Sequence, residues 1–425
     1  MTLTLIRNAR LIDPEAGTVG PGSLLIGATV IGRGARDEAA PEGAAVIDAQ
    51  GLCLAPGIVD IGVKVGEPGE RHKESFRSAG LAAARGGVTT IVTRPDTMPA
   101  IDTPEALAFV LRRAQADALV RVLPMAALTK GRAGREMAEI GLLRDAGAVA
   151  FSDGDRVVAD TRILQRAMTY ARGLDALIVA HVQEPGLSGA AVATNGRFAT
   201  LKGLPWVHPL AERIGLDRDL GLVEMTGVRW HADQITTARA LPALARAKGN
   251  GLDVTAGVGV HHLTLNEFDV ADYRTFFKLR PPLRAEEDRM AVVAALAEGA
   301  IDILCSLHTP QDEESKRLPF EEAAPGAVGL ETLLPAALRL FHAGDITLPQ
   351  LFRALALNPA RRLGLPQGRL AAGAPADLVL FDPDRSFRLD RSTLASKSRN
   401  TPFDGQMLQG QVRRTFVGGV EVWHA

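Results

Sequence analysis

The chain has few cysteines and no excess of either charge. Only Cys53 and Cys305 occur in 425 residues, and both lie in apolar runs. Two isolated thiols of this kind favour buried free cysteines in a reducing cytoplasm over a disulfide framework. The 48 Lys and Arg balance 49 Asp and Glu, which gives a formal net charge of −1. This balance gives no electrostatic reason to expect nucleic acid or an anionic membrane as a partner.

The sequence also lacks a long apolar run and a recognisable targeting segment. Its first residues, MTLTLIRNARLIDP, alternate apolar and polar side chains and predict a strand, not a signal peptide or a transmembrane helix. There is no internal repeat and no low-complexity segment. Apolar residues make up 46 % of the chain, a normal globular share that argues against disorder. We therefore expect a soluble cytoplasmic protein with a sizeable core.

Two kinds of pattern divide the chain. Both ends hold short runs of alternating apolar residues separated by glycine and proline, which predicts antiparallel strands. Between them, short apolar runs alternate with helical patterns, and this order predicts parallel βα units. By its length, this part predicts an α/β fold of the (β/α)8 TIM-barrel type. We place the barrel at residues 55–365 and a small β-sandwich domain, built from both chain ends, at residues 1–54 and 366–425.

Several blocks that follow the predicted barrel strands resemble the signature segments of dihydroorotases, members of the amidohydrolase superfamily. The C-terminal ends of the strands carry the chemistry in such barrels. The similarity covers essentially the whole chain, and the SKSRNTPF block favours dihydroorotases over the related hydantoinases and allantoinases. The blocks are APGIVDIGVKVGEPGE, TRPDTMP, FSDGD, AHVQEP, RWHADQ, VTAGVGVHHL, RPPLR, SLHTPQDE, NPARRLGL and SKSRNTPF.

The resemblance implies a divalent metal, usually zinc, held partly by two histidines that alternate on the first barrel strand. Side chains alternate between the two faces of a strand, so Asp60, Gly62 and Lys64 lie on the face that carries those histidines in the family. Glycine has no ligand atom, and a protonated lysine amine has no lone pair to offer a metal. The family's substrate-binding arginine corresponds to Gly66. Its asparagine corresponds to Asp96, which would repel an anionic substrate.

The resemblance implies further losses at the other strand ends. The family's later metal histidine corresponds to Gln234, and its catalytic aspartate corresponds to Leu307, so we assign no catalytic residue. Three more positions differ in the same way: Gln183 replaces a glutamate, Arg280 an asparagine and Gln311 a histidine.

A few positions keep the family's residue type. Asp153 and His181 are the remnant metal-ligand positions. His308 also survives, although the family does not use it as a ligand, and His231 matches another non-ligand histidine. The vestigial pocket that we predict consists of Asp60, Gly62, Lys64, Asp96, Asp153, His181, Gln234, Arg280 and His308.

The number of side chains left to bind a metal ion predicts that the dihydroorotase reaction is lost. A catalytic zinc normally has three protein ligands and an open position, and Asp153 and His181 alone fall short of that. Without a metal, the pKa of a bound water stays near about 15.7 instead of falling to about 7. The general base that could compensate is Leu307 here. We therefore expect no metal cofactor and no dihydroorotase activity.

Two local expectations follow. Removing a metal from a carboxylate-lined pocket leaves a buried negative charge that needs a partner, and we expect Lys64 to pair with Asp153. His261 and His262 are adjacent, and adjacent residues on a strand point to opposite faces, so we expect a structural role for this pair and not a metal site.

Two functions from different classes remain. In the first, the chain is a non-catalytic scaffold, because the resemblance extends to ligand-stripped bacterial dihydroorotase-like chains that associate with the catalytic subunit of aspartate carbamoyltransferase and support its assembly. In the second, it is an active cyclic amidohydrolase with a rearranged zinc site, for which the available side chains are Asp153, His181, His231 and His308. A homo-oligomer and a small-molecule binding role also stay open.

Overall fold

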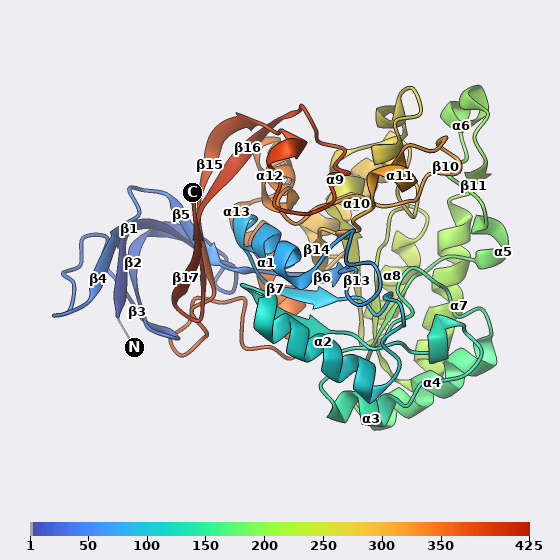
Figure 1. Cartoon of the computed structure of the whole chain (residues 1–425), viewed down its shortest axis with the longest axis horizontal. Coiled ribbons are helices and arrows are strands. Elements are labelled where there is room, and N and C mark those ends of the chain that lie inside the picture. Colours follow the sequence, from blue (N-terminus) through green and yellow to red (C-terminus); the bar gives the residue numbers. More distant parts are fainter. Residues whose placement is uncertain (1–2) are drawn as a thin grey trace.

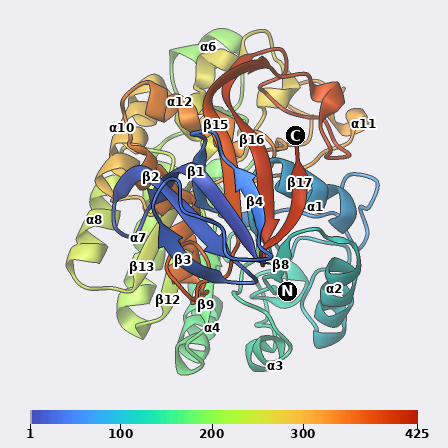
Figure 2. The same cartoon turned by 90° about the vertical axis from the view of Figure 1, so that its left-hand side faces the viewer.

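The computed structural model describes residues 3–425 and shows a barrel with a mixed sheet packed beside it (Figure 1). The two chain ends meet in this sheet, at the left of Figure 1, and the rest of the chain forms the barrel. Figure 2 looks at the sheet side and shows it lying in front of the barrel.

The barrel strands are parallel and follow one another in chain order. Three of them pair in one set, β6 (Ile58–Val63), β7 (Val88–Thr93) and β8 (Arg121–Pro124). Four pair in a second set, β9 (Leu177–Ala180), β12 (Arg229–Ala232), β13 (Val254–Gly259) and β14 (Ile303–Cys305). The fourth strand position is reduced to Phe151, which bridges Ala126 on one side and Ile178 on the other. The predicted eight-fold α/β barrel is confirmed.

A buried carboxylate closes the barrel between its first and last strands. Asp60 on β6 accepts hydrogen bonds from the backbone N–H of Ser306 at 2.8 Å and from the Ser306 hydroxyl. The backbone N–H of Lys64 donates to the carbonyl oxygen of His308 at 2.8 Å. Burial raises the pKa of Asp60 to about 6, although both hydrogen bonds from Ser306 oppose that shift. The sequence placed Asp60 on the pocket face, but it is a closure residue.

Helices cover the outside of the barrel, and several begin at side-chain caps. Ser75 forms a capping box with Ser78, and Asp160 accepts hydrogen bonds from the next turn. The longer helices are α1 (Phe76–Arg85), α2 (Pro104–Asp117), α3 (Ile140–Asp145), α4 (Thr161–Gly173), α7 (Leu210–Thr226), α8 (Leu241–Gly249), α10 (Glu286–Glu298) and α12 (Leu333–His342).

Shorter elements lie in the loops and after the barrel. The short helices are α5 (Pro185–Ser188), α6 (Arg197–Lys202), α9 (Val260–Thr264), α11 (Glu313–Lys316), α13 (Leu348–Phe352) and α14 (Asn358–Arg362). β10 (Ala193–Thr194) pairs with β11 (Trp206–Val207). Single turns of 3₁₀ helix span Lys130–Arg132, Glu267–Val270, Thr275–Phe277 and Arg391–Thr393, and a π-helical turn spans Arg353–Leu357.

The small domain is one continuous eight-stranded mixed sheet. Its strands are β1 (Thr4–Asp13), β2 (Thr18–Ile26), β3 (Val30–Gly34), β4 (Ala45–Asp48), β5 (Cys53–Pro56), β15 (Leu378–Arg388), β16 (Met407–Val417) and β17 (Val420–His424). Their order is β17-β16-β15-β5-β1-β2-β3, and β4 pairs with β1.

β5 joins the two halves of the sheet, because it pairs with β1 on one side and with β15 on the other. It extends to Pro56, two residues past the predicted end of the first segment, and it leads directly into β6. The division into domains at residues 54 and 366 stays a prediction.

A buried polar cluster ties the SKSRNTPF block to the barrel. Glu74 accepts hydrogen bonds from the hydroxyl groups of Ser78 and Ser396, and it lies 3.3 Å from His308 Nε2. The Nδ1 atom of His308 accepts from the backbone N–H of Gly329 at 3.1 Å, so Nε2 carries the proton that faces Glu74. Burial would raise the pKa of Glu74, but the hydrogen bonds from His308, Ser396 and Ser78 lower it.

Both cysteines are buried and free, as the sequence predicts. Within residues 3–425, no helix is long and apolar enough to cross a bilayer.

The closure contact gives a first prediction. We expect Asp60→Ala to lower the free energy of unfolding by roughly 2–4 kcal/mol, because it leaves both donors of Ser306 buried without an acceptor. Asp60→Asn keeps an acceptor in place and should cost less. Urea unfolding of the three proteins measures this, and equal stability of wild type and Asp60→Ala would contradict the closure role.

Candidate functional site

The first metal position of the barrel mouth is filled by a leucine side chain. Gly62 has φ +90°, and a Cβ built on it would lie 3.2 Å from Cδ2 of Leu307. A Cβ built on Gly259 would lie 2.6 Å from Cδ1 of the same leucine. Leu307 itself has φ +48°, an unusual conformation for a non-glycine residue. Its isobutyl group therefore packs between two glycines, where a larger side chain at either position would clash.

The expected pair between Lys64 and Asp153 is wrong. Lys64 Nζ lies 3.1 Å from Glu70 and 3.7 Å from Asp96, and its side chain is 15 % exposed. Asp153 instead accepts hydrogen bonds from the backbone N–H groups of Leu128 and Thr129 at 3.1 and 3.0 Å, and from the Thr129 hydroxyl. Because local donors already satisfy this carboxylate, it needs no distant cation. Burial raises the pKa of Asp153 despite these bonds.

Arg94 is a buried cation beside the pocket residue Asp96, and the sequence analysis missed it. It follows β7 directly, and its side chain is 8 % exposed. Its Nε and Nη2 atoms contact the two carboxylate oxygens of Asp96 at 3.2 and 2.9 Å. Burial would lower the pKa of Arg94, but the charges of Asp96, Asp155 and Asp233 hold it above its ordinary value. Asp96 is thus held by a fixed partner within the protein.

Asp155 and Asp233 are the other two carboxylates of this network. Asp155 is 2.6 Å from Arg132 and 3.5 Å from Arg280. Burial would raise the pKa of Asp155, but the charges of Arg94, Arg132 and Arg280 lower it to about 2. Asp233 follows β12 and lies 3.8 Å from Nδ1 of His181.

A cavity of about 170 Å³ opens beside these groups. The side chain of Arg280 is 52 % exposed at this cavity, and Gln234 donates to the Arg280 carbonyl oxygen at 3.2 Å. The carbonyl oxygen of the Gln234 side chain is buried without a partner among residues 3–425. The lining residues include Asp155, His181, Gln183, Arg280, Val207, Leu279 and Pro281.

Three of the changed positions now have structural partners. A Cβ on Gly66 would lie 2.4 Å from the carbonyl oxygen of Glu70, so this backbone excludes a side chain there. Gln183 donates to Glu212 at 3.4 Å, and Gln311 donates to the carbonyl oxygen of Pro325 at 2.9 Å. Gln183 is thus bound to helix α7, and Gln311 is bound to the loop that contains Pro325.

The other histidines considered in the sequence analysis do not lie together at one site. His231 shares a hydrogen bond of 2.8 Å with the Thr255 hydroxyl, and His308 belongs to the Glu74 cluster. His261 and His262 lie in the short helix α9, so describing them as strand residues was wrong. His261 stacks on Phe403, and His262 contacts the Pro281 carbonyl oxygen at 3.1 Å. Burial lowers the pKa to about 3 for His231 and His261, and to about 4 for His262.

These residues do not fit a divalent metal. Gly62, Lys64 and Leu307 offer no ligand atom in their present states, and the Asp153 carboxylate already accepts three hydrogen bonds. Within residues 3–425, no three His, Cys, Asp or Glu side chains come close enough together to share a metal ion. The four side chains of the rearranged-site hypothesis each have a separate partner.

The missed residues had a weak signal in the sequence. Arg94 and Asp233 each directly follow a barrel strand, and Asp155 lies two residues after a remnant ligand position. Charged residues at the ends of buried strands point into a barrel mouth. The resemblance singles out only the family's metal-ligand and catalytic positions. Arg94, Asp155 and Asp233 lie between those positions, so the resemblance does not mark them.

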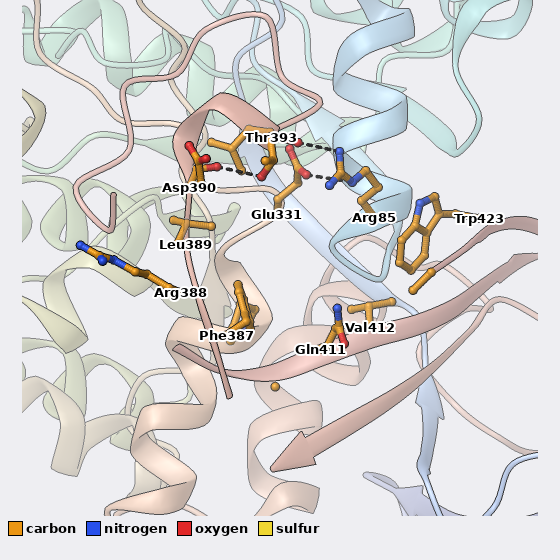
Figure 3. A pocket seen from close by; sticks show the side chains of 14 residues that line it. Arg85, Glu331, Phe387, Arg388, Leu389, Asp390, Thr393, Gln411, Val412 and Trp423 are labelled. Atoms are coloured by element: carbon orange, nitrogen blue, oxygen red, sulfur yellow. Dashed lines mark hydrogen bonds and ion pairs between the residues drawn. The ribbon is translucent and has the colours of Figure 1, made fainter. Parts of the chain in front are cut away.

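A second cavity, of about 370 Å³, lies away from the mouth between the barrel helices and the small sheet (Figure 3). The side chain of Arg85 lines one side of this cavity. Its guanidinium lies 3.1 Å from the Glu331 carboxylate and donates a hydrogen bond to the Thr393 carbonyl oxygen. The Trp423 indole lines the sheet side. Arg388 donates to the Gly405 carbonyl oxygen, and Asp390 accepts from the backbone N–H of Ser392. The charged groups of this cavity are therefore engaged in local contacts that hold its walls.

Comparison with known proteins supports the predicted family. Residues 51–240 match the dihydro-orotase-like family, and residues 327–423 match an amidohydrolase family. The chain is 38 % identical to a dihydroorotase from Pelobacter propionicus over 419 residues, which cover 99 % of each chain. It is 39 % identical to a dihydroorotase from Anaeromyxobacter dehalogenans over 416 residues, 97 % of this chain and 96 % of that one. The chain belongs to the dihydroorotase family.

Solved structures show the same fold for this dihydroorotase homologue. The L-hydantoinase (dihydropyrimidinase) from Arthrobacter aurescens superposes with a TM-score of 0.89 at 25 % identity, covering 100 % of this chain and 96 % of that chain. The dihydropyrimidinase from Brevibacillus agri gives 0.85 at 22 % identity, with 100 % and 95 % coverage. These similarities confirm the amidohydrolase barrel with its mixed sheet.

The buried neutral histidines predict a loss of stability in mild acid. His231 has a pKa of about 3 in the folded protein and an ordinary value of 6.5, so the unfolded chain binds the additional proton between these values. Stability therefore falls as pH decreases from 6.5 toward 3. His231 alone should account for up to about 2 kcal/mol between pH 7 and pH 5.

Urea unfolding at pH 7 and pH 5 tests this. His231→Asn, which keeps a polar group near Thr255, should lose less stability between the two pH values than wild type. The same pH dependence in both proteins would show that His231 does not contribute.

Proposed function

We propose that this dihydroorotase homologue of pyrimidine biosynthesis is catalytically inactive. The observation that carries this proposal is the chemistry of the barrel mouth. Leu307 fills the space beside Gly62, and Lys64 is engaged with Glu70 and Asp96. Hydrolysis of a cyclic amide at neutral pH needs an activated water and a group to accept its proton. The side chain of Leu307 can neither activate a water molecule nor accept its proton.

Family membership by itself favours an active cyclic amidohydrolase, because the relatives are named dihydroorotases. That alternative needs Asp153, His181, His231 and His308 around one zinc ion. Asp153, His231 and His308 each have other hydrogen-bond partners, so the chain would have to rearrange several buried contacts to bring the four side chains together.

We further propose that the protein acts as an assembly subunit for the catalytic subunit of aspartate carbamoyltransferase, in the cytoplasm. The support for this is indirect. A chain that loses its catalytic groups but keeps a closed barrel, its Glu74 cluster and its mixed sheet has a fold that serves some other purpose. A scaffold needs that fold and does not need the metal.

The inactivity proposal is tested on purified protein. We expect less than about 0.1 zinc per chain by elemental analysis, and no dihydroorotate turnover above background, because the donor set falls below the three ligands of a catalytic zinc site. A purified dihydroorotase from the same family, assayed in parallel, is the positive control. Stoichiometric zinc together with turnover would establish the rearranged active site instead.

The assembly proposal is tested separately in the native host. We expect tagged chain to co-purify with the transcarbamoylase subunit at a fixed stoichiometry, measured by the mass of the complex. Deletion of the chain should then lower the size of the transcarbamoylase assembly or its activity. An unchanged transcarbamoylase assembly in the deletion strain, with no complex recovered, would rule out this role.

A further inference from the structure

The cavity between the barrel and the small sheet has the size of a site for a small organic ligand (Figure 3). Its volume of about 370 Å³ is more than twice the 170 Å³ of the cavity at the mouth. Pockets that bind small molecules commonly measure about 300–1,000 Å³. The walls come from the end of α1, the residues before α12 and the strands β15, β16 and β17. Both the barrel and the sheet therefore contribute to this space.

Two aromatic side chains form walls of the cavity. Figure 3 shows Phe387 on one side of the open space and Trp423 on the other. Both side chains are only partly buried, although they pack against the main core. The buried side chains of Leu389, Leu394 and Val412 complete the apolar lining. These walls favour a flat ring, because stacked and edge-on contacts between aromatic rings contribute more than their buried area alone.

Irregular pairing in the sheet shapes the same space. The register between β15 and β16 shifts between Asp382 and Ser386, directly before Phe387, and such irregularities change the direction of the side chains that follow. Opposite the shift, Gly410 has φ +103°, and a Cβ built on it would lie 2.2 Å from Cδ1 of Leu338. The sheet thus departs from regular pairing where it borders the cavity.

One edge of the cavity offers a donor and an acceptor next to each other. Arg85 Nε lies 3.1 Å from Glu331 Oε2, and Arg85 Nη1 donates to the Thr393 carbonyl oxygen at 2.9 Å. Glu331 Oε1 accepts from the backbone N–H groups of Ala395 and Ser396 at 2.7 and 3.4 Å. Within residues 3–425, Arg85 Nη2 has no acceptor and Glu331 Oε2 has only its contact with Arg85. Both groups are held in place, and each keeps one atom available to a ligand.

The amide edge of a ring matches this pair. Its N–H can donate to Glu331 Oε2 while its C=O accepts from Arg85 Nη2, which gives two neighbouring hydrogen bonds to charged groups. An open-chain secondary amide is trans, so its N–H and C=O point in opposite directions, whereas a small ring holds both on one edge. A neutral ligand suits the site, because the charges of Arg85 and Glu331 already balance each other.

We propose that this cavity binds a flat cyclic amide. The ring lies between Phe387 and Trp423, and the amide N–H and C=O bond to Glu331 and Arg85. The bound ligand also stabilises the attachment of the C-terminal block to the barrel, because Glu331 holds the backbone of Ala395. This binding function is additional to the proposed function and does not depend on an inactive mouth.

The competing explanation is a solvent-filled gap between the barrel and the sheet. Such a gap would take up flat apolar compounds according to their hydrophobicity, without regard to their hydrogen-bonding groups. The two explanations therefore differ in how binding depends on the amide N–H and on the side chain of Arg85.

The experiment is isothermal titration of the full chain with 2-quinolinone, a flat bicyclic lactam. We expect one site per chain with a Kd below about 1 mM. The matched compound is 1-methyl-2-quinolinone, which keeps the rings and the C=O but has no N–H. It should bind at least about fivefold more weakly, because Glu331 Oε2 is then covered without a donor.

Two pairs of variants locate the site. Trp423→Leu removes an aromatic wall and should weaken binding by at least about fivefold. Its control is Trp206→Leu on β11, which is 50 % exposed and lies outside the cavity lining. Arg85→Lys keeps the charge but loses the second terminal nitrogen, and it should also weaken binding by at least about fivefold. Its control is Arg77→Lys on the same helix, where the side chain is 78 % exposed. Both controls should leave the Kd within about twofold of wild type.

Three results would overturn the proposal. The first is no binding of 2-quinolinone up to its solubility limit. The second is equal affinity for the two compounds, which is the behaviour of an unspecific gap. The third is equal affinity in each variant and its control. If Trp423→Leu does not fold, the comparison of Arg85→Lys with Arg77→Lys decides alone. None of these results alters the outcome of the zinc and turnover measurements that test the proposed function.

Discussion

Negative charge buried at the open end of a barrel must be balanced within the protein or by a bound ion, and this constraint governs the mouth described here. The protein satisfies it in two ways. Asp153 is stabilised locally by backbone and hydroxyl donors of the 128–129 segment, while Asp96 pairs with Arg94 and Asp155 pairs with Arg132. Both solutions use groups that are part of the chain.

The loss of the metal positions is coupled to packing. Leu307 stands at the position of the family's catalytic aspartate, and its side chain enters the space that Gly62 and Gly259 leave open. A histidine placed back at position 62 would meet this leucine, and a side chain at Gly66 would meet the backbone of Glu70. The changes are therefore mutually dependent, and no single substitution would restore the family's donor set.

The elements that hold the barrel together are independent of that chemistry. Asp60 joins the first and last strands through Ser306, and Glu74 joins His308 to the C-terminal block through Ser396. This explains how the family's sequence blocks persist in a chain whose mouth differs: they encode closure and docking of the loops, which a scaffold needs as much as an enzyme.

The sequence by itself determined the α/β barrel, the mixed sheet from both chain ends and the family, because periodicity and motif order depend only on residue spacing. It also identified the positions without ligand atoms, such as Gly62 and Leu307. The tertiary structure decided which charges meet. Lys64 pairs with Glu70 and Asp96 instead of Asp153, and Arg94 also pairs with Asp96. Such pairings depend on distances across the barrel between strand ends far apart in the chain, and no local pattern records those distances.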